Sequence, residues 1–378
     1  MEPEKTSDWL VMLYLAGDND LFRFAETLIA EAQRVSSTDR VTVVAEHDPV
    51  QPDAQTFRGR FTGGRWDSFP IGITDGSPRD IVRFIRWAKG YPAKQRVFIH
   101  FDHGNGWQNV HVFEQVTEAS QELRIKAVIR QALTEEPTDV LCFDSCLMAM
   151  IEIVYELRMV KYIVASENVV PADLGWPYDA ILRSLTLRPG VTPEVVAKAM
   201  VDGFAGSYNG SDQPVTLTAF NVSVVEDAVA AIDRLSRELI AVCVNGDRSK
   251  VLLARQYAQS FGNPDYIDIV SFCEELQRLM KDTRVAAATS PVIDAIHSLI
   301  LAFTRSGAPS ISRANGVSIY FPSRPMSPQY ATLDFAQPDK CMWSSFIQMA
   351  APQLAAPVEL THEDLKLLRK SKGVNHAA

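Results

Sequence analysis

Two stretches of the chain, VFIHFDHGNGW at residues 97–107 and VLCFDSCLMAMIE at residues 140–152, decide its fold. Each opens on an apolar run typical of a buried strand, and each run ends at polar residues. His103 and Cys146 stand just beyond these two ends. Because the ligand crevice of an open parallel sheet lies outside the carboxyl ends of its strands, we expect both side chains at one edge of the sheet.

Similar segments flank this pair along the first half of the chain. Strands are predicted at 9–16, 41–45, 97–101, 140–143 and 162–165, with a hairpin from 56–61 and the residues after Gly63-Gly64. Helices are predicted over 20–35, from Ser77-Pro78, over 121–133 and over 147–157. This alternation predicts an α/β fold with a mostly parallel central sheet flanked by helices.

The second half of the chain is expected to be mainly helical, with strand-like stretches at 215–220 and 316–321. We divide the chain into an α/β core at residues 1–190 with His103 and Cys146, a helix-rich part at 191–355 that completes the fold, and a peripheral charged tail at 356–378.

Amino-acid composition limits the classes of binding partner that we expect. The chain has 378 residues, 47% of them apolar, and a formal net charge of -9, so we expect neither nucleic acid nor an anionic membrane as partner. No apolar run approaches the ~20 residues of a spanning helix. The first residues lack a signal-peptide pattern, which predicts a cytoplasmic protein, and secretion by another route stays open. Five scattered cysteines do not form a disulfide framework. The oligomeric state is not predicted.

The chemistry of His103 and Cys146 indicates nucleophilic catalysis. A thiolate is a strong nucleophile, and an imidazole within reach can exchange its proton. Cys146 directly precedes a predicted helix, whose positive end would lower the pKa of the thiol. Gly104 allows a substrate carbonyl to approach the backbone. Taken singly, a buried cysteine is more often a small apolar residue and such a histidine a hydrogen-bonded loop residue, but their joint position at two strand ends favours catalysis.

Several motifs in one consistent order resemble the clostripain-like cysteine peptidases. They are the histidine-glycine segment 101–107, the nucleophile segment 144–152, the opening strand and turn at 13–21, the segments 165–167 and 175–178 with Pro171, and the late strand at 316–322. The resemblance spans roughly residues 9–350. It implies a caspase-like α/β sandwich with a cysteine–histidine dyad that cleaves after arginine or lysine.

Carried over by position, the resemblance makes Cys146 the nucleophile and His103 the acid/base, with the backbone N–H groups of Gly104 and Cys146 as the oxyanion hole. It places Asp144 at the base of the substrate side-chain pocket and Asp173 as a second wall. A carboxylate in a partly dry pocket does pair well with a guanidinium or ammonium group. The alternative for Asp144 is a strand-end carboxylate that caps the following helix.

The resemblance also implies self-cleavage between the dyad residues, for which Arg124 and Lys126 are the candidate sites, and calcium dependence in some members. An intact amphipathic helix through Leu123, Ala127 and Leu133 is the alternative for that segment. No metal ligands are predicted, because Asp18-Asn19-Asp20 lacks the rest of an EF-hand loop. The loop 166–170 lacks the second acidic residue usual in the family after Ser-Glu, which leaves the pocket's detail open.

Two other classes of function compete with a peptidase. One is a catalytically idle or zymogen-like peptidase fold that acts as a binding or regulatory module. The other is a redox thiol protein that uses Cys142 and Cys146, whose spacing differs from that of thioredoxin-like motifs. The chain has no Gly-x-Ser-x-Gly elbow, phosphate-binding loop or zinc helix. His100 is the one alternative base, and its apolar surroundings favour a packed core position.

Overall fold

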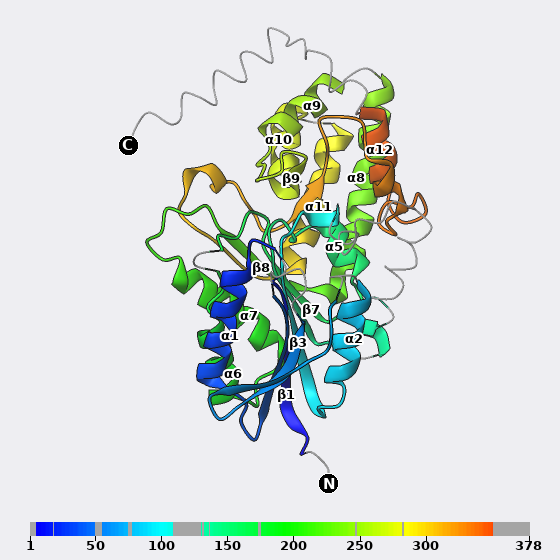
Figure 1. The fold of residues 1–378 in the computed structure, drawn as a ribbon. Helices are drawn as coiled ribbons and strands as arrows, with labels where there is room; N and C mark the ends of the chain where they lie inside the picture. The colour runs from blue at the N-terminus through cyan, green and yellow to red at the C-terminus, as the bar shows by residue number, and fades with distance from the viewer. Residues whose placement is uncertain are drawn as a thin grey trace.

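A single mixed sheet forms the centre of the fold (Figure 1). The computed structural model describes residues 5–17, 19–49, 55–74, 78–108, 130, 132–135, 137–172, 175–245, 248–281 and 283–350. In these residues the sheet has nine strands, in the order β10-β8-β7-β6-β5-β1-β2-β3-β4. They are β1 (Ser7–Ala16), β2 (Val41–Asp48), β3 (Phe57–Thr62), β4 (Arg65–Pro70), β5 (Ala93–Phe101), β6 (Val140–Asp144), β7 (Tyr162–Ala165), β8 (Thr216–Asn221) and β10 (Ile300–Arg305).

The five central strands, β7, β6, β5, β1 and β2, run parallel, and the pairings toward both edges are antiparallel. The predicted α/β class and the mostly parallel centre of the sheet are confirmed. The hairpin after residue 56 is also confirmed, as β3 and β4.

Register places the ends of three central strands side by side. Leu15 of β1 pairs with Phe101 of β5, and Phe101 pairs with Asp144 of β6. The loops that follow these strands therefore leave the sheet at one edge. They carry Asp20, His103 and Cys146 respectively.

Helices cover both faces of the sheet, so its central strands are apolar on both sides. Val11, Leu13 and Leu15 of β1 pack into one core cluster, and Leu10, Met12 and Tyr14 pack into the other. The first cluster also holds α1 (Phe22–Val35), α6 (Tyr178–Leu187) and α7 (Pro193–Ser207), and the second holds α2 (Pro78–Ala88) and α5 (Ile151–Glu156). Figure 1 shows α1, α6 and α7 on one side of the sheet and α2 on the other.

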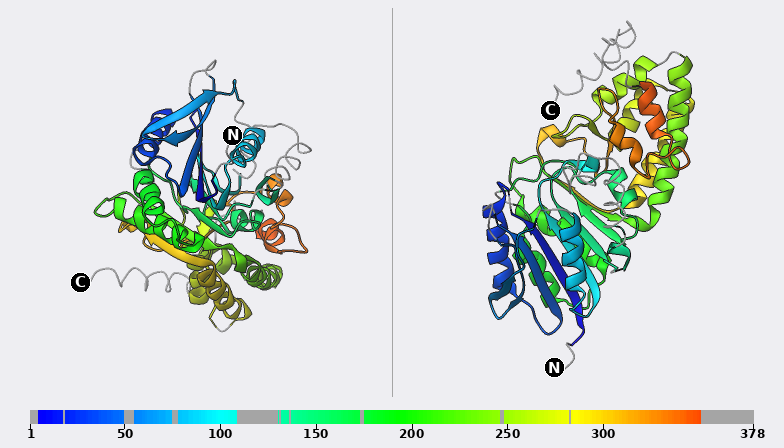
Figure 2. Two further views of the ribbon diagram at one scale, coloured as in Figure 1. Left: turned by 90° about the horizontal axis from the view of Figure 1, so that it is seen from below. Right: turned by 45° about the vertical axis from the view of Figure 1, so that its right-hand side comes forward.

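The remaining helices gather at the end of the molecule away from the N-terminus (Figures 1 and 2). They are α8 (Val225–Asn245), α9 (Arg248–Tyr257), α10 (Ile269–Leu279), α11 (Arg284–Leu299) and α12 (Trp343–Ala350). A small antiparallel sheet of β9 (Tyr266–Asp268) and β11 (Ser318–Tyr320) lies with them. The second half of the chain also supplies β8 and β10 to the main sheet. The domain boundary at residue 190 stays a prediction. None of the described helices is both long and apolar enough to span a bilayer.

The helix expected directly after Cys146 begins later, at Ile151, so this part of the sequence reading is wrong. Leu147 takes a positive φ of 63°. The Leu147 N–H donates to Asn168 O and the Ala149 N–H to Ser166 O, while Met150 forms a bridge with Ser318. Pairing with distant segments therefore satisfies backbone groups that a helix would have used.

Candidate active site

A cavity of about 220 Å³ opens at the shared strand edge. His103, Asp144 and Cys146 all line it, together with the wall formed by Val169–Ala172. The structure thus brings the predicted nucleophile, the predicted acid/base and the predicted pocket carboxyl into one cleft. His103 and Cys146 each lie two residues past a paired strand position, Phe101 and Asp144, so the matched register of β5 and β6 accounts for this meeting.

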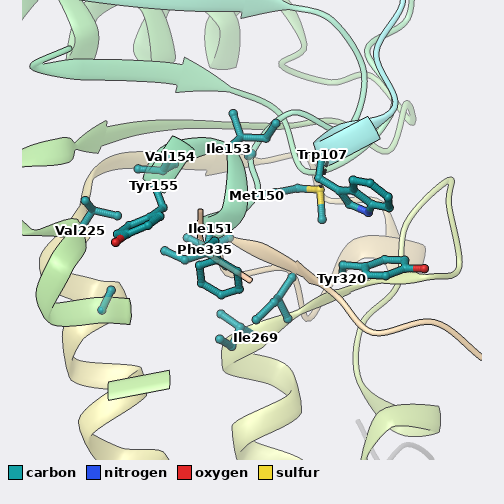
Figure 3. Packing of buried hydrophobic residues seen from close by; sticks show 14 of the residues in the cluster. Trp107, Met150, Ile151, Ile153, Val154, Tyr155, Val225, Ile269, Tyr320 and Phe335 are labelled. Carbon is teal, nitrogen blue, oxygen red and sulfur yellow. Dashed lines mark hydrogen bonds between the residues drawn. The ribbon is translucent and has the colours of Figure 1, made fainter. Parts of the chain in front are cut away.

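Close backbone packing joins the histidine loop to the cysteine turn. A Cβ on Gly104 would lie 2.0 Å from Cys146 O and 2.6 Å from Cys146 N, so only glycine fits there. Gly106 has a φ of 61°, and its Cβ would meet Met150 Sδ at 2.4 Å. The Trp107 N–H points at the same sulfur at 3.3 Å, and its ring packs on Tyr320 at 5.1 Å between centroids (Figure 3). These contacts tie the His103 loop to the segment that follows the cysteine.

On the histidine side of the cleft, the imidazole faces a carboxylate. His103 Nε2 lies 2.6 Å from Asp20 Oδ1, and both side chains are exposed, at 57% and 81%. The pKa of Asp20 falls because of its hydrogen bond to His103. The loop backbone is also held, because the His103 N–H donates to Asp102 Oδ1 at 2.6 Å and Asn19 Nδ2 donates to the same oxygen at 3.1 Å.

On the cysteine side, the thiol is half-buried and the Val170 N–H donates to its sulfur at 3.4 Å. Burial raises the pKa of the Cys146 thiol, and the Val170 hydrogen bond acts in the opposite direction. The expected lowering by a helix dipole is wrong, because Cys146 does not stand at a helix N-terminus. A backbone donor, rather than a helix end, favours the thiolate here.

Asp144 is buried beside the cysteine, and its side chain is held from the neighbouring helix. The Tyr178 hydroxyl, at the first residue of α6, donates to Asp144 Oδ2 at 3.0 Å. Burial raises the pKa of Asp144 to about 7, and the Tyr178 hydrogen bond opposes this rise. A helix-capping role for Asp144 is not supported, since the next helix begins at Ile151 with no side-chain cap.

His100, the alternative base, and Cys142, the second cysteine of the redox alternative, both lie in the core. His100 is 3% exposed, stacks on Tyr14 at 5.6 Å, and has its pKa lowered to about 3 by burial. The expectation of a packed His100 is confirmed. Cys142 is buried with its sulfur 3.4 Å from Met200 Sδ, and both Cys142 and Cys146 are free thiols. Burial raises the Cys142 pKa well above its ordinary value, which disfavours a redox role.

Other predictions fall outside the described residues or find no support within them. Asp173, Arg124 and Lys126 lie outside the described residues, so the second pocket wall and the self-cleavage sites stay predictions. Within the described part of the chain, no group of three or more His, Cys, Asp or Glu side chains could hold a metal ion.

Sequence reasoning gave no role to three residues of the site: Asp20, Val170 and Tyr178. Asp20 was visible as an acidic residue after a strand that ends at the same edge, which is the one signal that could have singled it out. Val170 acts through its backbone, which carries no sequence signal. The contact of Tyr178 with Asp144 follows from the packing of α6 in the core cluster that also holds Cys142 of β6, and neither local motif predicts it.

A cysteine and a histidine that follow two adjacent parallel strands and line one cleft are the residue types that cysteine peptidases use as nucleophile and base. The clostripain family model (Peptidase_C11) matches residues 13–350, and the chain belongs to this family of cysteine peptidases. The resemblance seen in the sequence is confirmed.

Solved structures show the same fold. An inactive zymogen C11 protease from Parabacteroides distasonis aligns with a TM-score of 0.63 at 17% identity, over 87% of this chain and 97% of that chain. A secreted C11 cysteine protease from Bacteroides thetaiotaomicron, in complex with an irreversible peptide inhibitor, aligns with a TM-score of 0.64 at 17% identity, over 90% and 99%. No curated protein sequence matches the chain.

Proposed function

We propose that this cysteine peptidase is an endopeptidase that cleaves after arginine or lysine through a Cys146/His103 dyad. The observation that carries the proposal is the shared cleft, which is lined by Cys146, His103 and the buried carboxyl of Asp144. Family membership implies a peptide substrate.

The proposed reaction begins when His103 takes the proton of the Cys146 thiol, and the thiolate so formed attacks the carbonyl carbon of the scissile bond. The C–N bond then breaks, and His103 gives its proton to the leaving amine. Water, deprotonated by His103, attacks the resulting thioester and releases the acid and the thiol. Because His103 Nε2 faces the Asp20 carboxylate, the neutral ring that donates Nε2–H there carries its lone pair on Nδ1. Nδ1 is then the nitrogen that exchanges protons with the substrate.

The oxyanion of each tetrahedral intermediate needs fixed donors. Gly104 lies against the Cys146 backbone, and we assign the N–H groups of these two residues to this role. The closeness of the two backbones supports the assignment, because donors on separate loops must converge on one oxygen.

Specificity for a basic side chain rests on Asp144. Its carboxyl is buried and lines the cleft, so a guanidinium or ammonium that enters would pair with it in a medium poorer in water than the surface. A cationic side chain favours the ionised carboxyl. Since burial raises the pKa of Asp144 to about 7, cleavage after arginine should increase as the pH rises through that region.

Hydrolysis of paired fluorogenic peptides, ending in arginine or in aspartate, tests the function directly. The wild type should cleave the arginine peptide, and Cys146→Ala should lose at least about 10³-fold in kcat/KM while keeping its fold. Equal cleavage of both peptides would contradict the basic specificity. Cleavage of neither by folded protein, with or without calcium, together with no selective alkylation of Cys146 by iodoacetamide, would favour an idle scaffold.

A further inference from the structure

Tyr178 contacts Asp144 of the proposed specificity pocket with its hydroxyl and packs into the core with its ring. It is the first residue of α6, it is fully buried, and its hydroxyl is 3.0 Å from Asp144 Oδ2. Its aromatic ring belongs to the core cluster between the sheet and α1, α6 and α7. The ring is therefore fixed by packing, and the hydroxyl has a fixed position from which to hold the carboxyl.

The chain just before Tyr178 is part of the cleft. Pro171 and Gly175 line the cavity, and the Gly175 N–H donates to Pro171 O at 2.9 Å. Trp176 follows, 1% exposed, in the same core cluster as Tyr178. One short stretch therefore connects the wall beside the cysteine to the hydroxyl that contacts Asp144.

We propose that Tyr178 is a positioning residue for specificity: its hydroxyl fixes the Asp144 carboxylate at the base of the cleft and stabilises its charged form for a cationic substrate side chain. The inference rests on the proposed function, because it acts only through recognition by Asp144. Tyr178 touches neither the thiol nor the scissile bond in this assignment.

In the Tyr178–Asp144 hydrogen bond the phenol is the donor and the carboxyl is the acceptor. Burial and the neighbouring Asp144 raise the pKa of Tyr178 well above its ordinary value, so the phenol remains a donor throughout the working pH range. A donor to the ionised carboxyl favours that form. Removal of the hydroxyl should therefore raise the pKa of Asp144 above its present value of about 7.

Other groups around the pair titrate or carry charge and must be held constant in a test. Asp144 interacts with Cys142 and Cys146, Glu31 of α1 acts on Tyr178, and Asp102 and His103 line the same cleft. None of these groups is altered by Tyr178→Phe. The variant therefore changes one hydrogen bond in an otherwise identical set of charges.

The molecule contains a matched control. The Tyr330 hydroxyl donates to Glu152 Oε1 at 2.8 Å, Tyr330 is fully buried, and burial raises the pKa of Glu152 to about 7. Neither residue lines the cleft. Tyr330→Phe removes the same chemical contact from a buried carboxyl without touching the proposed pocket.

The experiment measures kcat/KM for peptides that end in arginine and in a neutral residue, from pH 5 to 9, in wild type, Tyr178→Phe, Tyr330→Phe, Asp144→Asn and Asp144→Asn/Tyr178→Phe. In the pH profile of kcat/KM, we expect Tyr178→Phe to move the rise on the acidic side, which ionisation of Asp144 sets, upward by about one pH unit. The variant should also raise KM more than it lowers kcat. Tyr330→Phe should keep the wild-type pH profile. In the Asp144→Asn background, Tyr178→Phe should have no further effect on selectivity for arginine. Alkylation of Cys146 by iodoacetamide reports on the thiol independently of the peptide.

Each outcome is decisive. The role of Tyr178 is overturned if Tyr178→Phe keeps the wild-type pH profile of kcat/KM. It is also overturned if Tyr178→Phe lowers selectivity for arginine as much in the Asp144→Asn background as in wild type. Either result leaves the arginine specificity intact. The same shift in Tyr330→Phe also overturns it, because a general effect of losing a buried phenol would then suffice. Arginine preference retained in Asp144→Asn overturns both this inference and the proposed pocket.

Discussion

Two buried tyrosine–carboxyl pairs of this protein share their chemistry and differ in their surroundings. Tyr178 donates to Asp144 at 3.0 Å and Tyr330 donates to Glu152 at 2.8 Å. Burial raises the pKa of both carboxyls to about 7. Asp144 lines the cleft beside Cys146, whereas Glu152 lies in α5 and also accepts the Tyr320 N–H at 2.8 Å, which ties that helix to β11. The perturbed pKa therefore does not distinguish the two carboxyls, whereas their position at the cleft or away from it does.

The largest expected contrast is between Asp144→Asn and Glu152→Gln in peptide cleavage. Asp144→Asn removes the charge that is proposed to pair with a cationic side chain, so kcat/KM for an arginine peptide should fall by about 10²-fold. Glu152→Gln should leave this value within about twofold, because the residue is outside the cleft. The measurement is kcat/KM for peptides that end in arginine and in a neutral residue. Equal losses of kcat/KM in the two variants would show that the two tyrosine–carboxyl pairs do not differ in function.

The next contrast concerns stability and pH. Glu152 has an ordinary pKa of 4.5 and a folded-state pKa of about 7, so the folded protein binds its proton more tightly than the unfolded chain. Its contribution to the free energy of unfolding is fully present below about pH 4.5 and is lost as the pH rises through about 7, by up to about 3 kcal/mol. Glu152→Gln, which cannot ionise, should flatten this dependence.

Denaturant unfolding at pH 5 and pH 8 checks this expectation. Wild type should lose more stability between the two values than Glu152→Gln does. Asp39→Asn is a suitable control, because Asp39 is exposed. Matching pH dependence in wild type and Glu152→Gln would show that the Glu152 carboxyl is solvated in the folded protein.

The smallest expected effect belongs to the exposed pair across the cleft. Asp20 faces His103 Nε2, but both side chains are largely in water, where such pairs are screened. Asp20→Ala should lower kcat/KM by less than about tenfold, and Asp20→Asn, which keeps an acceptor, should lie between that variant and wild type. Assays of kcat/KM at low and high salt measure how strongly salt weakens the interaction between Asp20 and His103. A loss as large as that of Asp144→Asn would show that burial does not set the size of these contributions.

Much of the fold was predictable because local pattern and burial agree. The central strands are covered on both faces, so they read as continuous apolar runs such as 9–16 and 97–101. The strand-end rule then placed His103 and Cys146 at one edge, and the common cleft confirms that placement. Asp144 was also predicted beside them.

The failures share one cause. Residues 147–150 have helical propensity, yet their backbone pairs with 166–168 and with Ser318, which lie far along the chain. The predicted helix dipole at Cys146 disappeared with this helix, and the Val170 N–H took its place beside the sulfur. No local pattern encodes either contact.

The sequence by itself determined the α/β class, the family and the two side chains proposed for catalysis, because these depend on periodicity and on short motifs at strand ends. Only the tertiary structure decided what surrounds those side chains: the carboxylate at His103, the backbone donor at Cys146 and the phenol at Asp144. The reason is physical. Burial and pKa depend on every group within a few ångströms, and in this chain those groups come from elements that are distant in sequence.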